Sequence, residues 1–207
     1  ASNAASLVFN GGSLRSVGTN AAGVVQARQT PSVSIDRLFT LAGNGGIYSY
    51  GSYGNLTQGR NGNNAALIFS NTGPVAFTGT GARTLTLGGD SYGDNQINLQ
   101  LINNTVDGSA LTLISAGGLW ILGNNTNSYT GPTVINSGSL RADDGTSLPT
   151  GSSLRLNGGV LQTSGLFTRA IGAGAGQVEW SDASTGVNKN GGFAASFAPL
   201  VVNLGGA

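Results

Sequence analysis

The chain has 207 residues, of which 39% are hydrophobic and 8% are charged, and it contains 36 glycines but no Cys, His or Met. Nine basic and eight acidic residues are scattered without a run of either sign, so we expect neither nucleic acid nor an anionic membrane surface as a partner. The lack of Cys and His excludes ordinary zinc sites, and no apolar run is long enough for a transmembrane helix. Short apolar segments in a glycine-rich chain instead indicate a folded, turn-rich all-β protein.

Short apolar segments bounded by Gly, Asn, Ser or Pro recur along the chain and predict strands. Residues 32–41 are apolar enough for a helix, but their first half alternates and Pro31 and Gly43 bound them, so we expect strand there too. The other expected strands cover residues 6–9, 13–16, 46–50, 66–69, 75–78, 83–87, 96–101, 111–114, 119–122, 133–135, 139–141, 153–156, 160–163, 177–180 and 200–204. This density of short strands is typical of a sandwich, a barrel or a solenoid.

Internal repetition favours the solenoid. Residues 6–15 resemble residues 153–162, with Ser, Leu, Asn, Gly, Gly and Leu at matching positions, and a Leu-Phe-Thr tripeptide follows each copy. The end of the chain therefore resembles its beginning, which predicts one large unit plus part of the next. In each copy an Asn-Gly-Gly corner joins two strands with inward-pointing apolar residues. The corner residues are Asn10, Gly11, Gly12, Asn157, Gly158 and Gly159.

Residues 120–140 carry a more specific pattern, a Trp-Ile-Leu-Gly-Asn-Asn segment followed by Ser-Tyr-Thr-Gly-Pro-Thr-Val-Ile-Asn-Ser-Gly-Ser-Leu. This pattern resembles the autotransporter-associated β-strand repeat of large exported bacterial surface proteins, with an extra residue or two before Tyr129. The motif positions are Trp120, Gly123, Tyr129, Gly131, Asn136 and Gly138. The resemblance implies a right-handed parallel β-helix at the cell surface or outside the cell, and it implies no chemistry.

We therefore predict that residues 1–207 form a single continuous β-solenoid of about ten coils, with layers roughly 4.8 Å apart. The large aromatic residues are expected to lie mostly inside, as stacked rows. Asn10, Asn136 and Asn157 are expected to form corner ladders whose side chains satisfy neighbouring turns.

Catalytic patterns are weak. Residues 89–93 match the G-x-S-x-G nucleophile elbow, but that site needs a histidine base. A glycine–aspartate segment at residues 88–94 resembles calcium-binding repeats but occurs once, and no cofactor or metal is expected. The candidate acid pairs are Asp143 with Asp144, Glu179 with Asp182, and Asp90 with Asp94. We expect these to be solvated turn residues, since a glycosidase needs two carboxyls at a defined separation in a groove.

An aromatic patch at Tyr48, Tyr50 and Tyr53 is the candidate ligand-binding surface, because tyrosines on a flat sheet can stack on sugars or a protein partner. Coverage of the tube's outside or closure of its end is the other explanation, and we favour it from the sequence because isolated surface aromatics are common. The leading hypothesis is a non-enzymatic stalk, fibre or sheath element that associates with itself end to end. An adhesin that binds glycan or protein along one face is the second hypothesis, and a polysaccharide-degrading enzyme is the third.

Overall fold

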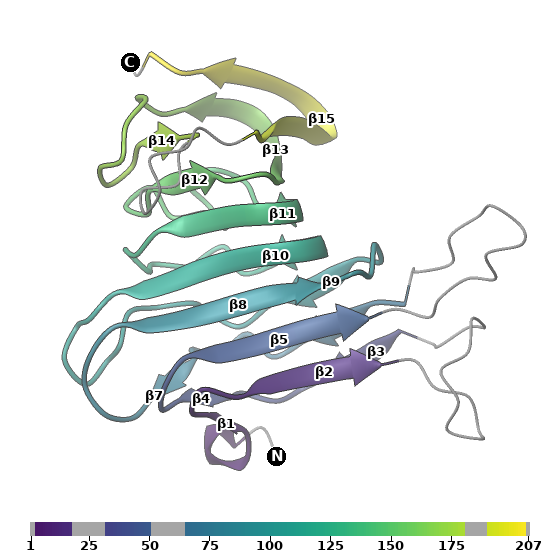
Figure 1. The fold of residues 1–207 in the computed structure, drawn as a ribbon, viewed down its shortest axis with the longest axis vertical. Helices are drawn as coiled ribbons and strands as arrows, with labels where there is room; N and C mark the ends of the chain where they lie inside the picture. Colours follow the sequence, from purple (N-terminus) through teal and green to yellow (C-terminus); the bar gives the residue numbers. More distant parts are fainter. Residues whose placement is uncertain (1–2, 18–31, 51–64, 181–189, 206–207) are drawn as a thin grey trace, which may run out of the picture.

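The computed structural model describes residues 3–17, 32–50, 65–180 and 190–205, and these form an all-β structure (Figure 1). A short 3-10 helix, η1 (Ala4–Ser6), precedes the strands. The strands are β1 (Val8–Phe9), β2 (Ser13–Val17), β3 (Val33–Ile35), β4 (Thr40–Leu41), β5 (Gly45–Tyr50), β6 (Leu67–Phe69), β7 (Ala76–Phe77), β8 (Arg83–Gly89), β9 (Asn95–Ile97), β10 (Leu111–Leu122), β11 (Thr133–Arg141), β12 (Leu154–Leu156), β13 (Val160–Thr168), β14 (Val178–Glu179) and β15 (Gly192–Asn203). Within this described part, no helix is long and apolar enough to cross a membrane.

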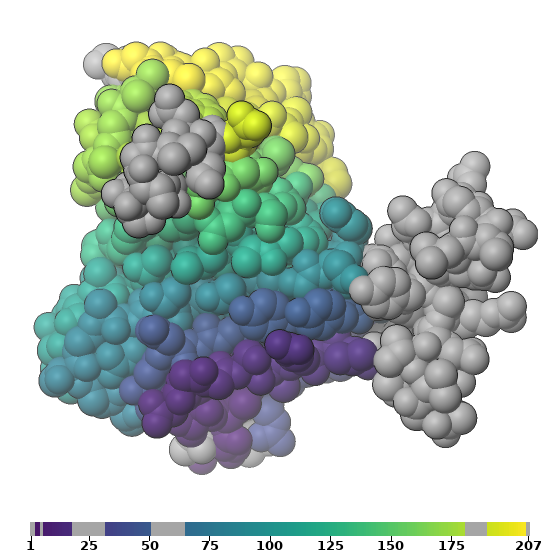
Figure 2. All heavy atoms as spheres, in the orientation of Figure 1, coloured from purple at the N-terminus to yellow at the C-terminus, as the bar shows by residue number. Residues whose placement is uncertain are grey.

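The strands pair in parallel and form three rows. The first row runs β2-β5-β8-β10-β11-β12-β14, and the third row runs β1-β4-β7. The second row runs β3-β6-β9 and continues through the later halves of β10 and β11 to β13 and β15. Sequence order follows the long axis of the stack, from purple to yellow (Figures 1 and 2). Parallel rows joined by crossovers fit a β-solenoid.

The first and second rows have seven strands each in the described part of the chain, fewer than the ten coils expected. The reason is coil length. Leu14 pairs with Ile47, and Ile47 pairs with Leu87, so these layers use far more than the roughly 20 residues of a minimal solenoid repeat. Only later partners, such as Ile135 and Leu156, are spaced close to that minimum. The long segments between the early strands therefore leave fewer residues to form further layers.

Alternating side chains fill the interior, as expected for strands with one buried face. Phe39 contacts Phe9 and Phe69 edge-on, with ring centroids 5.2 and 5.9 Å apart, so an aromatic row links the first layers. The predicted burial is confirmed for Phe9, Phe39, Phe69, Phe77, Trp120 and Phe167, whereas Trp180 is only half-buried.

Glycines bend β10 and β11, so segments that the sequence predicts as separate strands are continuous. Gly117, Gly118 and Gly138 have φ angles of 111°, 62° and 69°, at the points where the register shifts. A Cβ on Gly138 would lie 2.3 Å from the Gly118 carbonyl oxygen, and one on Gly117 would lie 2.4 Å from that of Gly89. These bends therefore need glycine both for backbone conformation and for close approach of the layers.

The two copies of the internal repeat occupy different corners of the stack. In residues 6–15 the Asn-Gly-Gly corner leads from β1 in the third row to β2 in the first row. In residues 153–162 it leads from β12 in the first row to β13 in the second row. The repeat therefore describes a similar turn at two different corners, and its two copies are not separated by whole turns as a repeated unit would require.

The bend at Gly138 provides a stability test. Gly138→Ala should lower the free energy of unfolding by about 3 kcal/mol, because a strained positive φ and a steric clash both oppose the methyl group. Gly108→Ala is the matched control, since Gly108 has a φ of +75° but nothing within 4 Å of its Cβ position. The control should lose only about 1 kcal/mol, the conformational part. Urea unfolding measures both, and equal losses would contradict close approach of the layers at this bend.

Candidate functional site

The predicted asparagine ladder is partly confirmed. The Asn157 side-chain amide donates to the Asn136 side-chain oxygen at 2.8 Å, on the exposed outside of the corner between two successive layers. Asn10 lies at the β1–β2 corner, in the first layer, and does not join this pair. The ladder is therefore a single pair, and its exposure indicates that it contributes little to the stability of the core.

Buried asparagines that the sequence reasoning missed connect the layers instead. The Asn127 side chain accepts a hydrogen bond from the Leu101 amide at 2.8 Å and donates to the Ser147 carbonyl at 2.9 Å. Asn95 likewise accepts from Leu67 and donates to Leu119, at 2.9 and 2.8 Å. Each side chain thus forms hydrogen bonds with backbone groups of the layers on both sides. Without these bonds, those buried backbone groups would lack a partner. No pattern in the sequence singles these asparagines out, because no glycine follows either of them to mark a corner.

Several of the motif residues are buried or lie where adjacent layers touch. Trp120 and Tyr129 are fully buried. A Cβ on Gly123 would lie 1.9 Å from the Asn98 side-chain oxygen, and one on Gly131 would lie 2.3 Å from the Leu111 carbonyl oxygen. These glycines allow the corners of adjacent layers to touch, so these motif positions serve packing.

A buried hydroxyl chain surrounds Tyr129. Its hydroxyl lies 2.8 Å from the Thr133 hydroxyl, which in turn lies 2.8 Å from that of Ser152. Ser152 donates to the Gly131 carbonyl at 2.7 Å. Burial raises the pKa of the Tyr129 phenol far above its usual value, and the hydrogen bond with Thr133 only partly offsets that effect. Tyr129 is therefore a neutral packing group.

Three of the candidate acids, Glu179, Asp144 and Asp94, form ion pairs, and the expectation of solvated turn residues is wrong for Glu179 and Asp144, which are little exposed. Glu179 is 8% exposed and lies 2.6 Å from the Arg155 Nε atom on the neighbouring strand. Asp144 accepts from the Arg169 guanidinium at 2.6 Å, where that arginine is 3% exposed. Both acids neutralise a nearby arginine, which leaves neither arranged as a free catalytic carboxyl. Asp182 lies outside the described residues.

The other catalytic patterns also have structural explanations. Ser91, the central serine of the G-x-S-x-G segment, is fully buried and its hydroxyl donates to the Ala65 carbonyl at 2.7 Å. Asp94 pairs with Arg141 at 3.3 Å and is largely exposed. Among the described residues no group of three acidic, Cys or His side chains could hold a metal ion.

Tyr48 and Tyr50 lie together on the outward face of β5. Their rings stack at 6.3 Å with an interplanar angle of 10°, and the Arg15 guanidinium of β2 lies 5.8 and 5.9 Å from the two ring centroids. Tyr53 lies outside the described residues. The predicted patch is therefore a platform of two tyrosines and one arginine, which we call the tyrosine face.

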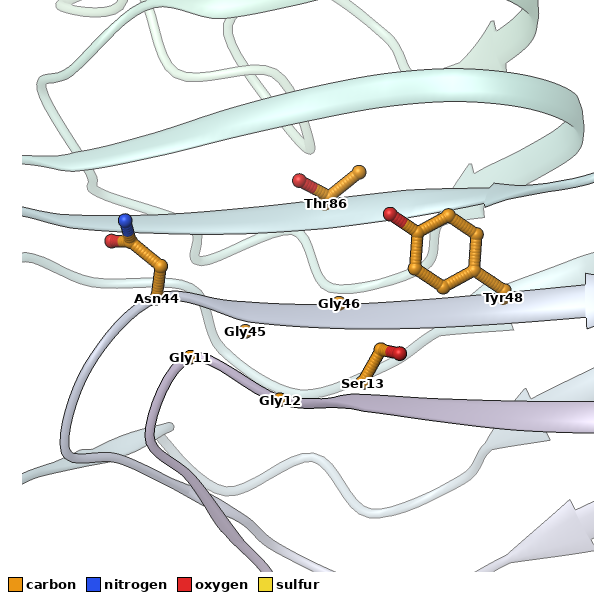
Figure 3. Close-up of a pocket in the computed structure, with 8 residues that line it drawn as sticks. All are labelled: Gly11, Gly12, Ser13, Asn44, Gly45, Gly46, Tyr48 and Thr86. Atoms are coloured by element: carbon orange, nitrogen blue, oxygen red, sulfur yellow. The ribbon is translucent and has the colours of Figure 1, made fainter.

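Glycines give Tyr48 room to lie along the sheet. A Cβ on Gly46 or on Gly88 would come within 2.7 or 2.8 Å of the ring. Figure 3 shows the ring extending along the sheet with its hydroxyl toward Thr86. Beside it is a shallow hollow of about 260 Å³ floored by glycines of β5 and of the β1–β2 corner, including Gly11 and Gly12. A flat ring beside a hollow is a shape that suits sugar or peptide binding.

The chain resembles an adhesin, the BmaC autotransporter of Brucella suis biovar 1 (strain 1330), with 38% identity over 112 residues. The match covers 53% of this chain but only 3% of that protein. No protein-family profile matches the chain, and no solved structure matches it. The similarity supports an autotransporter-related region, and the specific repeat family identified from the motif stays a prediction.

Proposed function

We propose that this chain is a non-enzymatic scaffold module of a bacterial surface protein, a section of β-solenoid stalk, fibre or sheath. The observation that carries the proposal is the location of exposed apolar side chains. Among the described residues, most large exposed apolar side chains lie at the ends, in the first and last layers; Tyr92 and Val106 lie elsewhere, and Phe197 of β15 faces back over Arg141. We infer a right-handed β-helix outside the cell, as the motif resemblance implies, and the similarity to an autotransporter adhesin supports that location.

The first layer exposes one valine on the first strand of each row. Val8 on β1, Val17 on β2 and Val33 on β3 are 52%, 47% and 41% exposed. Within the described ranges these strands each pair on one side only, with β4, β5 and β6. Unpaired backbone edges with apolar side chains favour addition of further strands.

The last layers have the same character. Leu166 on β13 and Val201 on β15 are 65% and 61% exposed, and they are register partners. Ile171 is 64% exposed, and among the strands that the structure describes β15 pairs with β13 alone. Both ends therefore present surfaces that another layer would cover, whether it comes from a longer chain or from a second copy.

End-to-end association tests the scaffold proposal. Val201→Lys should weaken self-association at least tenfold, because a lysine on an edge strand opposes strand addition. Val106→Lys is the matched control, since Val106 is 53% exposed but lies between β9 and β10, away from both ends. Sedimentation velocity of the 207-residue chain over a concentration series measures the effect. A wild-type chain that stays monomeric throughout, or equal effects of both variants, would contradict the proposal.

Adhesion through the tyrosine face is the second candidate function, supported by the stacked Tyr48 and Tyr50 rings and by the adhesin relative. Replacement of both tyrosines with Ala should abolish binding to immobilised glycans or to host-cell protein, because the flat contact area is lost. Tyr92→Ala is the control, since that ring is 65% exposed elsewhere. Glycan-array and cell-binding assays give the readout, and an undiminished signal from the double variant would exclude this face.

A further inference from the structure

A bulge in β15 carries an unusual exposed ring. The β13–β15 register runs from Thr163 with Ala195 directly to Gly165 with Leu200, so residues 196–199 have no partners in the ladder. Phe197, in this bulge, is 93% exposed and has a φ of 52°. That left-handed conformation is unfavourable for a bulky side chain, and such strain persists where the surrounding structure imposes it.

The ring points back over the stack and not toward the open edge. The Arg141 guanidinium lies 4.6 Å from the centroid of the Phe197 ring, and Arg141 belongs to β11, which β13 separates from β15. Arg141 is itself positioned by Gln162 at 3.2 Å and by Asp94 at 3.3 Å. A further layer added beyond β15 would therefore leave the ring in place, so end coverage does not explain its exposure.

Between this bulge and the layers beneath lies a cleft of about 340 Å³. Its apolar wall includes Phe197, Ile121 and Leu122, and its polar wall includes Asn125, Asp143 and Ser147. We call it the Phe197 cleft. It lies at the junction of β10, β11 and β15, and its lining residues are different from those of the hollow beside the tyrosine face.

Asp143 is held in a fixed orientation in the cleft. Its Oδ1 atom accepts hydrogen bonds from the Ser164 amide and hydroxyl, both at 2.8 Å, and from the Thr163 hydroxyl at 3.2 Å. In the described part of the chain no hydrogen bond is made to Oδ2. A carboxylate fixed through one oxygen, with the other available, can accept hydrogen bonds from ligand hydroxyls at little entropic cost.

We propose that the Phe197 cleft binds a neutral saccharide. An exposed aromatic ring provides a surface for the C–H face of a sugar, while the Asp143 carboxylate and the Asn125 amide can pair with its hydroxyls. The charges at the cleft favour a neutral ligand. Asp94 already neutralises Arg141, and Asp143 adds a negative charge that would repel an acidic ligand. This site depends neither on end-to-end association nor on the tyrosine face.

Saturation-transfer NMR and isothermal titration of the full chain test the cleft. The probes are lactose, maltose, cellobiose, chitobiose and N-acetyllactosamine, with sialyllactose as the acidic comparison. At least one neutral probe should bind, and Phe197→Ala and Asp143→Asn should each reduce its affinity at least tenfold. Phe197→Gly should do the same while removing the backbone strain, so a folding defect can be separated from loss of the ring.

Val106→Ala is the matched control, because Val106 is 53% exposed but does not line the cleft and lies away from both ends. The affinity of this control variant for the neutral sugar should equal that of the wild type. Absence of binding by all neutral probes would overturn the proposal. Preferential binding of sialyllactose would also overturn it, as would neutral-sugar binding that persists in both Phe197 variants. Loss of glycan binding only in the Tyr48 and Tyr50 double variant would assign binding to the tyrosine face and overturn the cleft.

Discussion

Parallel strands of successive layers stay hydrogen-bonded only if their backbones approach closely at every bend. In β10 and β11 the bends are made by Gly117 and Gly138, where any side chain would meet the carbonyl of the preceding layer. The same constraint acts at Gly131, against Leu111. Glycine content is therefore a consequence of stacking, and it leaves the interior to Leu, Phe and Trp side chains, which provide the apolar burial that stabilises the stack.

Close stacking also buries polar backbone at the corners, where the strand ladder stops. Asn95 and Asn127 satisfy these groups by bridging three layers each, and Arg169 does so near Asp144. These three buried side chains thereby hold neighbouring layers together. The binding sites that we propose therefore use outward side chains, those of the tyrosine face, of the Phe197 cleft and of the end layers.

The sequence predicts most strands because each is short, apolar and bounded by turn residues, as in 83–87 and 133–135. Burial of Trp120 and the aromatic row at Phe39 follow from the same alternation. The ion pair of Arg155 with Glu179 and the contact of Phe197 with Arg141 could not be predicted, because both depend on which residues meet across layers. That register depends on the length of each coil, which varies along the chain and also explains why the described rows hold fewer layers than the ten expected.

The parallel register itself is the central claim, and a spin-label distance tests it most directly. Ser13 pairs with Gly46, which pairs with Thr86, followed by Ile114 and Val134 across the next two strands. Four steps of about 4.8 Å separate Ser13 from Val134, so labels at these positions should give a narrow distribution near 19 Å. The chain has no cysteine, so the two introduced thiols are the only labelling sites. A broad distribution, or a distance well above 30 Å (roughly six layers or more), would contradict the stacked parallel arrangement.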